Sequence, residues 1–227
     1  MIIINKLSVS YKNKIVINNI RHQFSQGLIH GIVGLNGAGK TTLMNAIYGL
    51  KSIGVAGNVL YKNEKLVKKD VAYLPSELFY YSNITGKEYL DLFVNDSFDV
   101  LKWNKLFKLP LDVLVNTYSS GMKKKLGFLS ILKQDKAIIL LDEPFNTLDI
   151  ETCRIVRQII LKLKENKKTI IVTSHIIETL TDMCDLIHQL EDGYMKQTVQ
   201  STGFDEFKRI LHGNIEVHYG KILSELI

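Results

Sequence analysis

Apolar residues along this chain occur in short continuous runs, and each run ends at a polar or glycine-rich turn. Three of these runs, 28–33, 137–141 and 169–173, have the length and composition of strands that are buried in a sheet. The stretches 2–11 and 15–20 precede them and read as two strands, so we expect a β-hairpin at the start of the chain. The pattern therefore predicts antiparallel strands first and buried parallel strands afterwards.

The remaining apolar positions predict further strands and helices. Strands are expected at 55–61, at 71–74 before Pro75, and in a closing hairpin of 185–190 and 194–198. Helical spacing predicts helices at 43–48, which Gly49 closes, at 150–164 and at 204–211. Residues 84 to about 107 also have helical spacing. Their apolar face is made of Tyr89, Leu90, Phe93 and Val94, and Leu101, Leu106 and Phe107 are further apolar positions. We expect an α/β fold that a helical subdomain interrupts.

A phosphate-binding motif stands between the strand at 28–33 and the helix at 43–48. It fits the pattern G-x-x-x-x-G-K-[ST] and comprises Gly34, Leu35, Asn36, Gly37, Ala38, Gly39, Lys40, Thr41 and Thr42. Glycines allow successive backbone N–H groups to turn inward onto an anion, and the start of the helix adds its dipole. In this pattern Lys40 reaches the β- and γ-phosphates and the Thr41 hydroxyl binds Mg²⁺.

Acidic and histidine side chains follow two of the buried strands. Asp142 and Glu143 end one strand, and His175 follows the other. Because carboxyl ends of parallel strands meet at one edge of a sheet, we expect these residues beside the phosphate loop. Asp142 is then placed to help hold Mg²⁺, and Glu143 to polarise the attacking water.

Composition narrows the class of protein without naming its partners. The chain has 227 residues, 46% hydrophobic and 23% charged, which is typical of a globular α/β protein. We expect no membrane span and no signal peptide, and therefore a cytoplasmic protein. A net charge of +6 is compatible with a nucleotide binder, a protein near anionic lipid or a solvated lysine surface, and does not single out nucleic acid. Cys153 and Cys184 have no metal or redox spacing, so we expect reduced, partly buried thiols.

Two stretches have more than one interpretation when they are taken alone. Tyr11, at the end of the first strand, could stack on a nucleotide base, although a core or interface tyrosine is the better local interpretation. Residues 119–126 could be a capped amphipathic helix with a solvated lysine face, with Ser119 and Ser120 as N-cap candidates.

Taken in order, these motifs resemble those of the ATP-binding subunits of ATP-binding-cassette (ABC) transporters, over nearly the whole chain. In that resemblance Tyr11 matches the adenine-stacking aromatic, and Tyr118 to Met122 match the signature sequence L-S-G-G-Q. Residues 140–144 match the magnesium and catalytic-glutamate strand, residues 146–149 the S-G-L-D loop, and His175 the switch histidine.

The resemblance implies a P-loop NTPase core with an N-terminal antiparallel β subdomain. It makes residues 1–227 one ABC ATPase domain with an α-helical subdomain at about 77–135. It implies ATP and Mg²⁺ as cofactors, a second copy or related cassette that faces the first head to tail, and a membrane permease on whose cytoplasmic side the chain sits. No nucleic acid is expected. In the dimer, Ser119 and Gly121 of one chain would close on the γ-phosphate that Lys40 of the other holds, and Glu143, His175 and Lys40 would be catalytic.

Several positions depart from the family pattern. Ser76 and Glu77 stand where the family usually has a glutamine that contacts Mg²⁺ and couples to the membrane subunit. Ser120 and Met122 alter the signature, and Asn146 replaces the usual serine. The signature form resembles ATPase subunits of bacterial exporters more than those of importers. Two alternatives stay open at this point: a soluble ABC ATPase that acts as a mechanical or regulatory module, and a degenerate cassette that binds nucleotide as a structural partner.

Overall fold

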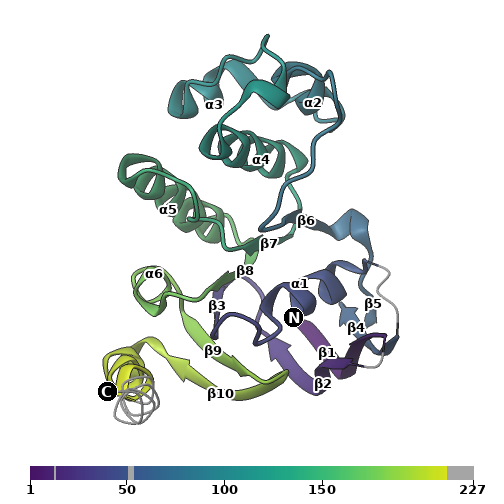
Figure 1. Cartoon of the computed structure of the whole chain (residues 1–227), viewed down its shortest axis with the longest axis vertical. Coiled ribbons are helices and arrows are strands. Elements are labelled where there is room, and N and C mark those ends of the chain that lie inside the picture. Colours follow the sequence, from purple (N-terminus) through teal and green to yellow (C-terminus); the bar gives the residue numbers. More distant parts are fainter. Residues whose placement is uncertain (13, 51–53, 214–227) are drawn as a thin grey trace, which may run out of the picture.

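The computed structural model describes residues 1–12, 14–50 and 54–213, which form two sheets and several groups of helices (Figure 1). The smaller sheet is antiparallel, in the order β2-β1-β4-β5. Its strands are β1 (Ile2–Tyr11), β2 (Lys14–Phe24), β4 (Val55–Tyr61) and β5 (Glu64–Lys65). The expected N-terminal hairpin is confirmed, because β1 pairs with β2 from Ile2 opposite Phe24 to Tyr11 opposite Lys14.

The larger sheet has the order β10-β9-β3-β8-β7-β6 and is parallel except for β10. Its strands are β3 (Ile29–Val33), β6 (Val71–Leu74), β7 (Ile138–Asp142), β8 (Thr169–Ser174), β9 (Leu186–Glu191) and β10 (Tyr194–Gln200). Strands β3, β8 and β7 are adjacent and parallel, so their carboxyl ends meet at one edge. The closing hairpin of β9 and β10 is confirmed as well.

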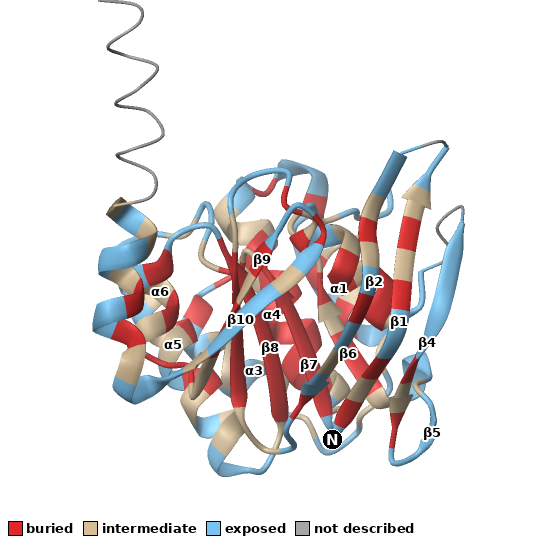
Figure 2. Cartoon of the chain, turned by 90° about the horizontal axis from the view of Figure 1, so that it is seen from below, coloured by how far each residue is buried: buried red, intermediate tan, exposed pale blue. Residues whose placement is uncertain are grey.

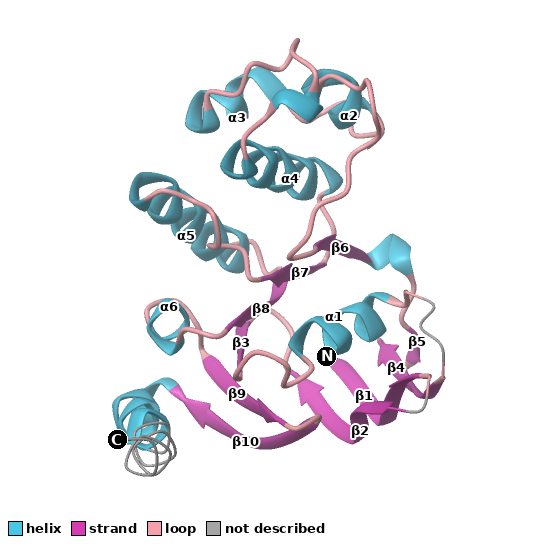
Figure 3. Cartoon of the chain, in the orientation of Figure 1, coloured by secondary structure: helices cyan, strands magenta, loops and turns pink. Residues whose placement is uncertain are grey.

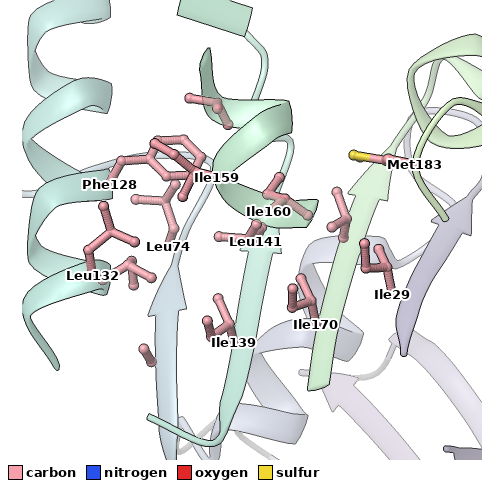
Figure 4. Close-up of a cluster of buried hydrophobic side chains, with 14 of the residues drawn as sticks. Ile29, Leu74, Phe128, Leu132, Ile139, Leu141, Ile159, Ile160, Ile170 and Met183 are labelled. Atoms are coloured by element: carbon pink, nitrogen blue, oxygen red, sulfur yellow. The ribbon is translucent and has the colours of Figure 1, made fainter. Parts of the chain in front are cut away.

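The larger sheet has an apolar core on each of its faces. Helix α1 (Lys40–Tyr48) packs between the two sheets, against a face that includes Ile138 and Leu140 of β7. The next residues of that strand, Ile139 and Leu141, point to the opposite face. There they meet α4 (Ser120–Gln134), α5 (Ile150–Glu165) and α6 (Ile177–Thr181) (Figure 4). The central strands are buried on both sides (Figure 2), which explains their continuously apolar sequences.

The chain between β6 and β7 forms a group of helices in which α2 and α3 lie away from the sheets (Figure 3), while α4 packs on the larger sheet. The group comprises α2 (Gly86–Asp91), α3 (Val100–Phe107) and α4. The short 3-10 helix Val115–Thr117 lies between α3 and α4. Thr85 and Glu88 form a capping box at the start of α2. The predicted apolar face was wrong at Val94 and Leu101, whose side chains are 89% and 74% exposed. Val94 lies beyond the end of α2 at Asp91, and Leu101 faces solvent in the first turn of α3. Residues 204–213 form a last helix, as the spacing predicted.

Three histidines join the two sheets through a line of hydrogen bonds. His22 Nε2 of β2 lies 3.1 Å from His188 Nδ1 of β9, and His188 Nε2 lies 3.0 Å from His30 Nδ1 of β3. His30 Nε2 lies 2.9 Å from the Ser25 carbonyl, which can only accept, so this nitrogen carries the hydrogen. With neutral rings, His188 Nε2–H donates to His30 Nδ1, and the single lone pair of His188 Nδ1 is shared by His22 Nε2–H and the Thr198 hydroxyl, which lies 2.9 Å away.

Candidate active site

The phosphate loop connects β3 to α1, and two of its glycines are required for different reasons. Gly39 has φ 104°, a left-handed conformation that is strained for any other residue, and it is the N-cap of α1. Gly34 is required for space, because a Cβ there would lie 2.3 Å from the Leu190 carbonyl oxygen of β9. Within the loop the Ala38 N–H donates to the Leu35 carbonyl, and the Ala38 carbonyl accepts from Gly193 N–H in the β9–β10 turn. The loop is therefore held from both sides.

Lys40 is buried, and its ammonium group contacts the phosphate loop and the end of β7. Its Nζ donates to the carbonyl oxygens of Gly34 at 2.8 Å and Leu35 at 3.3 Å. The same Nζ lies 3.5 Å from Glu143 Oε1. The expected meeting of the loop lysine with the acidic end of β7 is thus present in the structure.

Asp142 lies fully buried at the end of β7, where two hydroxyl groups donate to its carboxylate. Thr41 Oγ1 donates to Oδ2 at 2.7 Å, and Thr173 Oγ1 donates to Oδ1 at 2.5 Å. A hydroxyl and a carboxylate are oxygen ligands of the kind that Mg²⁺ takes together with water and phosphate. Among the described residues, no group of three or more His, Cys, Asp or Glu side chains is placed to hold a metal ion. The residues present therefore fit a magnesium nucleotide.

Glu143 follows Asp142 with φ 46°, a left-handed conformation that a glutamate rarely adopts. The Thr173 hydroxyl accepts a hydrogen bond from the Glu143 N–H at 3.0 Å and so helps to hold this turn. The Glu143 side chain is 12% exposed, and its Oε2 lies 3.1 Å from His175 Nδ1. Strained backbone at a buried acid is typical of functional sites. Lys40, Glu143 and His175 thus form one connected line.

The signature residues lie in another part of the chain. Ser119 is exposed and caps α4, accepting a hydrogen bond from the Met122 N–H at 3.2 Å. Gly121 lies close to the Thr147 carbonyl. A Cβ added to Gly121 would lie 3.0 Å from the Thr147 carbonyl oxygen. Figure 1 shows α4 with α2 and α3, well separated from α1 and the phosphate loop. One chain therefore does not bring Ser119 and Gly121 to Lys40.

An ion pair between Asp149 and Lys125 joins the loop after β7 to α4. Asp149 caps α5, and its hydrogen bonds to Thr152 lower the pKa of this carboxyl to about 2. Lys125 Nζ of α4 lies 3.5 Å from Asp149 Oδ2. This contact links the start of α4 to the loop that follows β7.

The other predicted site residues differ in exposure. Asn36, Gly37 and Thr41 are exposed on the phosphate loop and at the start of α1, whereas Ala38 is buried and Thr42 half-buried. Tyr11 is 40% exposed at the end of β1. Its stacking on a base stays a prediction, as do the roles assigned to the residues above.

Sequence reasoning missed Thr173 and Lys124. Thr173 bridges Asp142 and the Glu143 backbone, and its signal was a polar residue near the carboxyl end of a buried strand. Lys124 was included in a solvated lysine face, but it is 3% exposed. This expectation was wrong because Lys124 points into the interior beside the turn after β6, where its Nζ donates to Ser76 O at 3.1 Å.

Comparison with known proteins decides the family. The family model described as ABC transporter matches residues 17–146, more than half of the chain. The chain belongs to the ABC transporter family. Its class is that of an ATPase that binds ATP, as the motifs predicted.

Individual relatives support this assignment. The chain is 33% identical to the ABC transporter ATP-binding protein sll0415 of Synechocystis sp., over 88% of this chain and 62% of that protein. It is 30% identical to the ABC transporter ATP-binding protein YybJ of Bacillus subtilis, over 86% of this chain and 95% of the relative. The lantibiotic transport ATP-binding protein SrtF of Streptococcus pyogenes is 27% identical, over 95% of this chain and 97% of SrtF.

Solved structures share the fold. The ATP-binding subunit of an ABC transporter superposes with a TM-score of 0.81 at 23% identity, over 93% of both chains. A dimeric post-hydrolysis state of the ATP-binding cassette MJ0796, bound to ADP and Pi, gives 0.78 at 22% identity, over 88% of this chain and 99% of the other. The predicted fold class is confirmed.

Proposed function

We propose that two copies of this chain bind two ATP molecules head to tail and that closure and hydrolysis drive a separate membrane permease. One observation supports the dimer above all others. Lys40 and Glu143 lie together at the edge of the larger sheet, whereas Ser119 and Gly121 lie on the exposed start of α4. A helix N-terminus of this length attracts phosphate, and a second copy would supply it to the nucleotide.

Within this proposal the residues of one site divide the work of hydrolysis. Lys40 and the loop amides neutralise charge on the phosphates, and Tyr11 stacks on the base. Thr41 and Asp142 hold Mg²⁺, which when bound neutralises charge on the transferred phosphoryl group. Glu143 accepts a proton from the attacking water, and His175 holds that carboxylate in place from 3.1 Å.

We infer that the permease docks beside the turn after β6. Phe79 and Tyr81 are 81% and 63% exposed, and their rings meet edge to face with centroids 5.9 Å apart. Exposed aromatic residues of this size are typical of a protein interface. None of the described helices is long and apolar enough to cross a membrane, so a permease would provide the spans. Residues 1–227 then act as one cassette at the cytoplasmic face, with the helical subdomain at about 77–135 turned toward the permease.

We infer export as the direction of transport. The signature form Tyr118 to Met122 resembles that of exporter ATPases, and SrtF is described as a lantibiotic transport protein. Co-purification in detergent tests the permease. The chain should retain an apolar membrane protein in stoichiometric amount, and Phe79→Ser with Tyr81→Ser should lose it while ATP turnover is kept. Retention of the membrane protein by the double variant would contradict the docking site.

Complementation between two inactive variants tests the head-to-tail dimer. A Lys40→Ala chain keeps the signature, and a Gly121→Asp chain keeps the phosphate loop. Each alone should be inactive, whereas an equal mixture should recover about a quarter of wild-type turnover, because half of the dimers are mixed and each has one intact site. Mixing Lys40→Ala with a chain that carries both substitutions is the control without an intact loop. A main mixture no more active than this control would refute the arrangement.

A further inference from the structure

Lys124 is a buried cation in the middle of three consecutive lysines. It is 3% exposed on α4, whereas Lys123 and Lys125 are half-buried. Burial lowers the pKa of the Lys124 ammonium, while the charges of Asp142 and Glu143 oppose that shift. Within the described ranges no carboxylate lies within 4.0 Å of it. A charge buried without such a partner lowers stability, so its presence calls for another reason.

The ammonium group of Lys124 is held by the turn that follows β6. Its Nζ donates to the carbonyl oxygen of Ser76 at 3.1 Å and of Pro75 at 3.4 Å, the longer of the two being weak. The Tyr80 hydroxyl reaches the main chain of the same helix, donating to the Lys123 carbonyl at 2.5 Å. Helix α4 is thereby fastened to the segment in which Ser76 replaces a longer polar side chain.

We propose that Lys124 is a positioning residue for ATP hydrolysis, which ties the Pro75–Ser76 turn to the signature helix and orients both toward Asp142 and Glu143. Its positive charge attracts the two carboxylates at the end of β7 and lies on the helix whose first residues reach the partner's nucleotide. One side chain thus connects the strand that carries the catalytic acid, the turn that leads to the permease surface and the signature. This inference rests on the proposed function for the catalytic role of Glu143 and for the last two connections.

Lys124→Met separates positioning from simple packing. Methionine fills a similar volume without charge or donors, so the thermal midpoint should stay the same or rise, as when other buried charges are replaced. Turnover should nevertheless fall about tenfold or more with little change in KM, because a small displacement of catalytic groups lowers the rate of the chemical step. Lys124→Arg, which keeps the charge and donors, should restore most of the turnover. Lys123→Met is the matched control and should behave as wild type.

Amide hydrogen exchange of the full chain without nucleotide provides the second measurement. In Lys124→Met, exchange should become faster within residues 75–84 and stay unchanged in the core strands. Because this readout needs neither a dimer nor a permease, its failure is distinguishable from failure of the proposed function.

Three results would overturn the inference. One is turnover in Lys124→Met within about twofold of wild type. Another is unchanged exchange in residues 75–84. The third is a lowered midpoint with faster exchange along the whole of α4 and no rescue by arginine, which would make Lys124 a packing residue.

Discussion

The line of neutral histidines predicts that the fold loses stability in mild acid. His188 is 2% exposed, and burial together with the neighbouring His22 and His30 lowers its pKa to about 2. Burial also lowers the pKa of His30, against the opposing effects of the Ser25 carbonyl and Asp185. In the unfolded chain these histidines of the line bind a proton near pH 6.5, whereas in the folded chain they do so only at lower pH. Stability is therefore fully present above about pH 6.5 and falls as the pH falls below it.

The size of the effect follows from His188 alone. With an unfolded pKa of about 6.5 and any folded pKa below about 4, protonation of the unfolded chain lowers the free energy of unfolding by about 2 kcal/mol at pH 5. This loss is a large part of the 5–15 kcal/mol that is typical of whole domains. His30 adds to the loss in the same direction. The shifted carboxyl of Asp149 contributes only at lower pH, because its ordinary value is already 3.8.

Urea unfolding at pH 7, 6 and 5 and constant ionic strength, followed by circular dichroism, measures the effect. His188→Gln keeps an amide donor and acceptor but cannot bind a proton. The variant should be less stable than wild type at pH 7, and about 2 kcal/mol of that difference should disappear at pH 5. His212→Gln is the matched control, since His212 is 54% exposed and outside the line. A difference between wild type and His188→Gln that is the same at all three pH values would refute the reasoning.

Three further predictions concern the active site. Glu143→Gln should keep ATP affinity, lose turnover and trap an ATP-dependent dimer in size-exclusion chromatography, with exposed Glu206→Gln as the control; near-normal turnover would reject Glu143 as the catalytic carboxylate. Thr173→Val should lower the free energy of unfolding by about 1–3 kcal/mol and should also lower kcat. Thr169, a buried threonine on the same strand, is the control, and Thr169→Val should lower stability alone. Equal kcat in the two variants would contradict a positioning role for Thr173. Gly34→Ala should weaken ATP binding in calorimetry because the added Cβ has no room, and unchanged affinity would show that the loop moves freely.

The sequence predicted the sheets more fully than the helical group. Residues 138–141 are apolar at every position because both faces of β7 are covered, and such a run has few other interpretations. The short helices α2 and α3 lie between long connections, and a helical spacing did not reveal that α2 ends before Val94. Helix ends there depend on caps and on packing against α4, which local periodicity does not contain.

The site shows the same division. Asp142, Glu143 and His175 could be predicted to meet, since they follow strands whose carboxyl ends share an edge. The burial of Lys124 could not, because three consecutive lysines are alike in sequence and only the rotation of α4 decides which one points inward. The histidine line was missed for a related reason: it depends on the register of three strands that are far apart along the chain.

The contacts of Lys40 indicate how nucleotide binding changes the site. Its ammonium is already bonded to the carbonyls of Gly34 and Leu35 and faces Glu143. A phosphate group that binds the Lys40 ammonium must replace these three contacts. Part of the attraction between phosphate and Lys40 is therefore offset by the loss of the contacts with Gly34, Leu35 and Glu143. Glu143 then loses its contact with Lys40 and keeps its contact with His175. We therefore expect nucleotide binding to free the Glu143 carboxylate for the role proposed above.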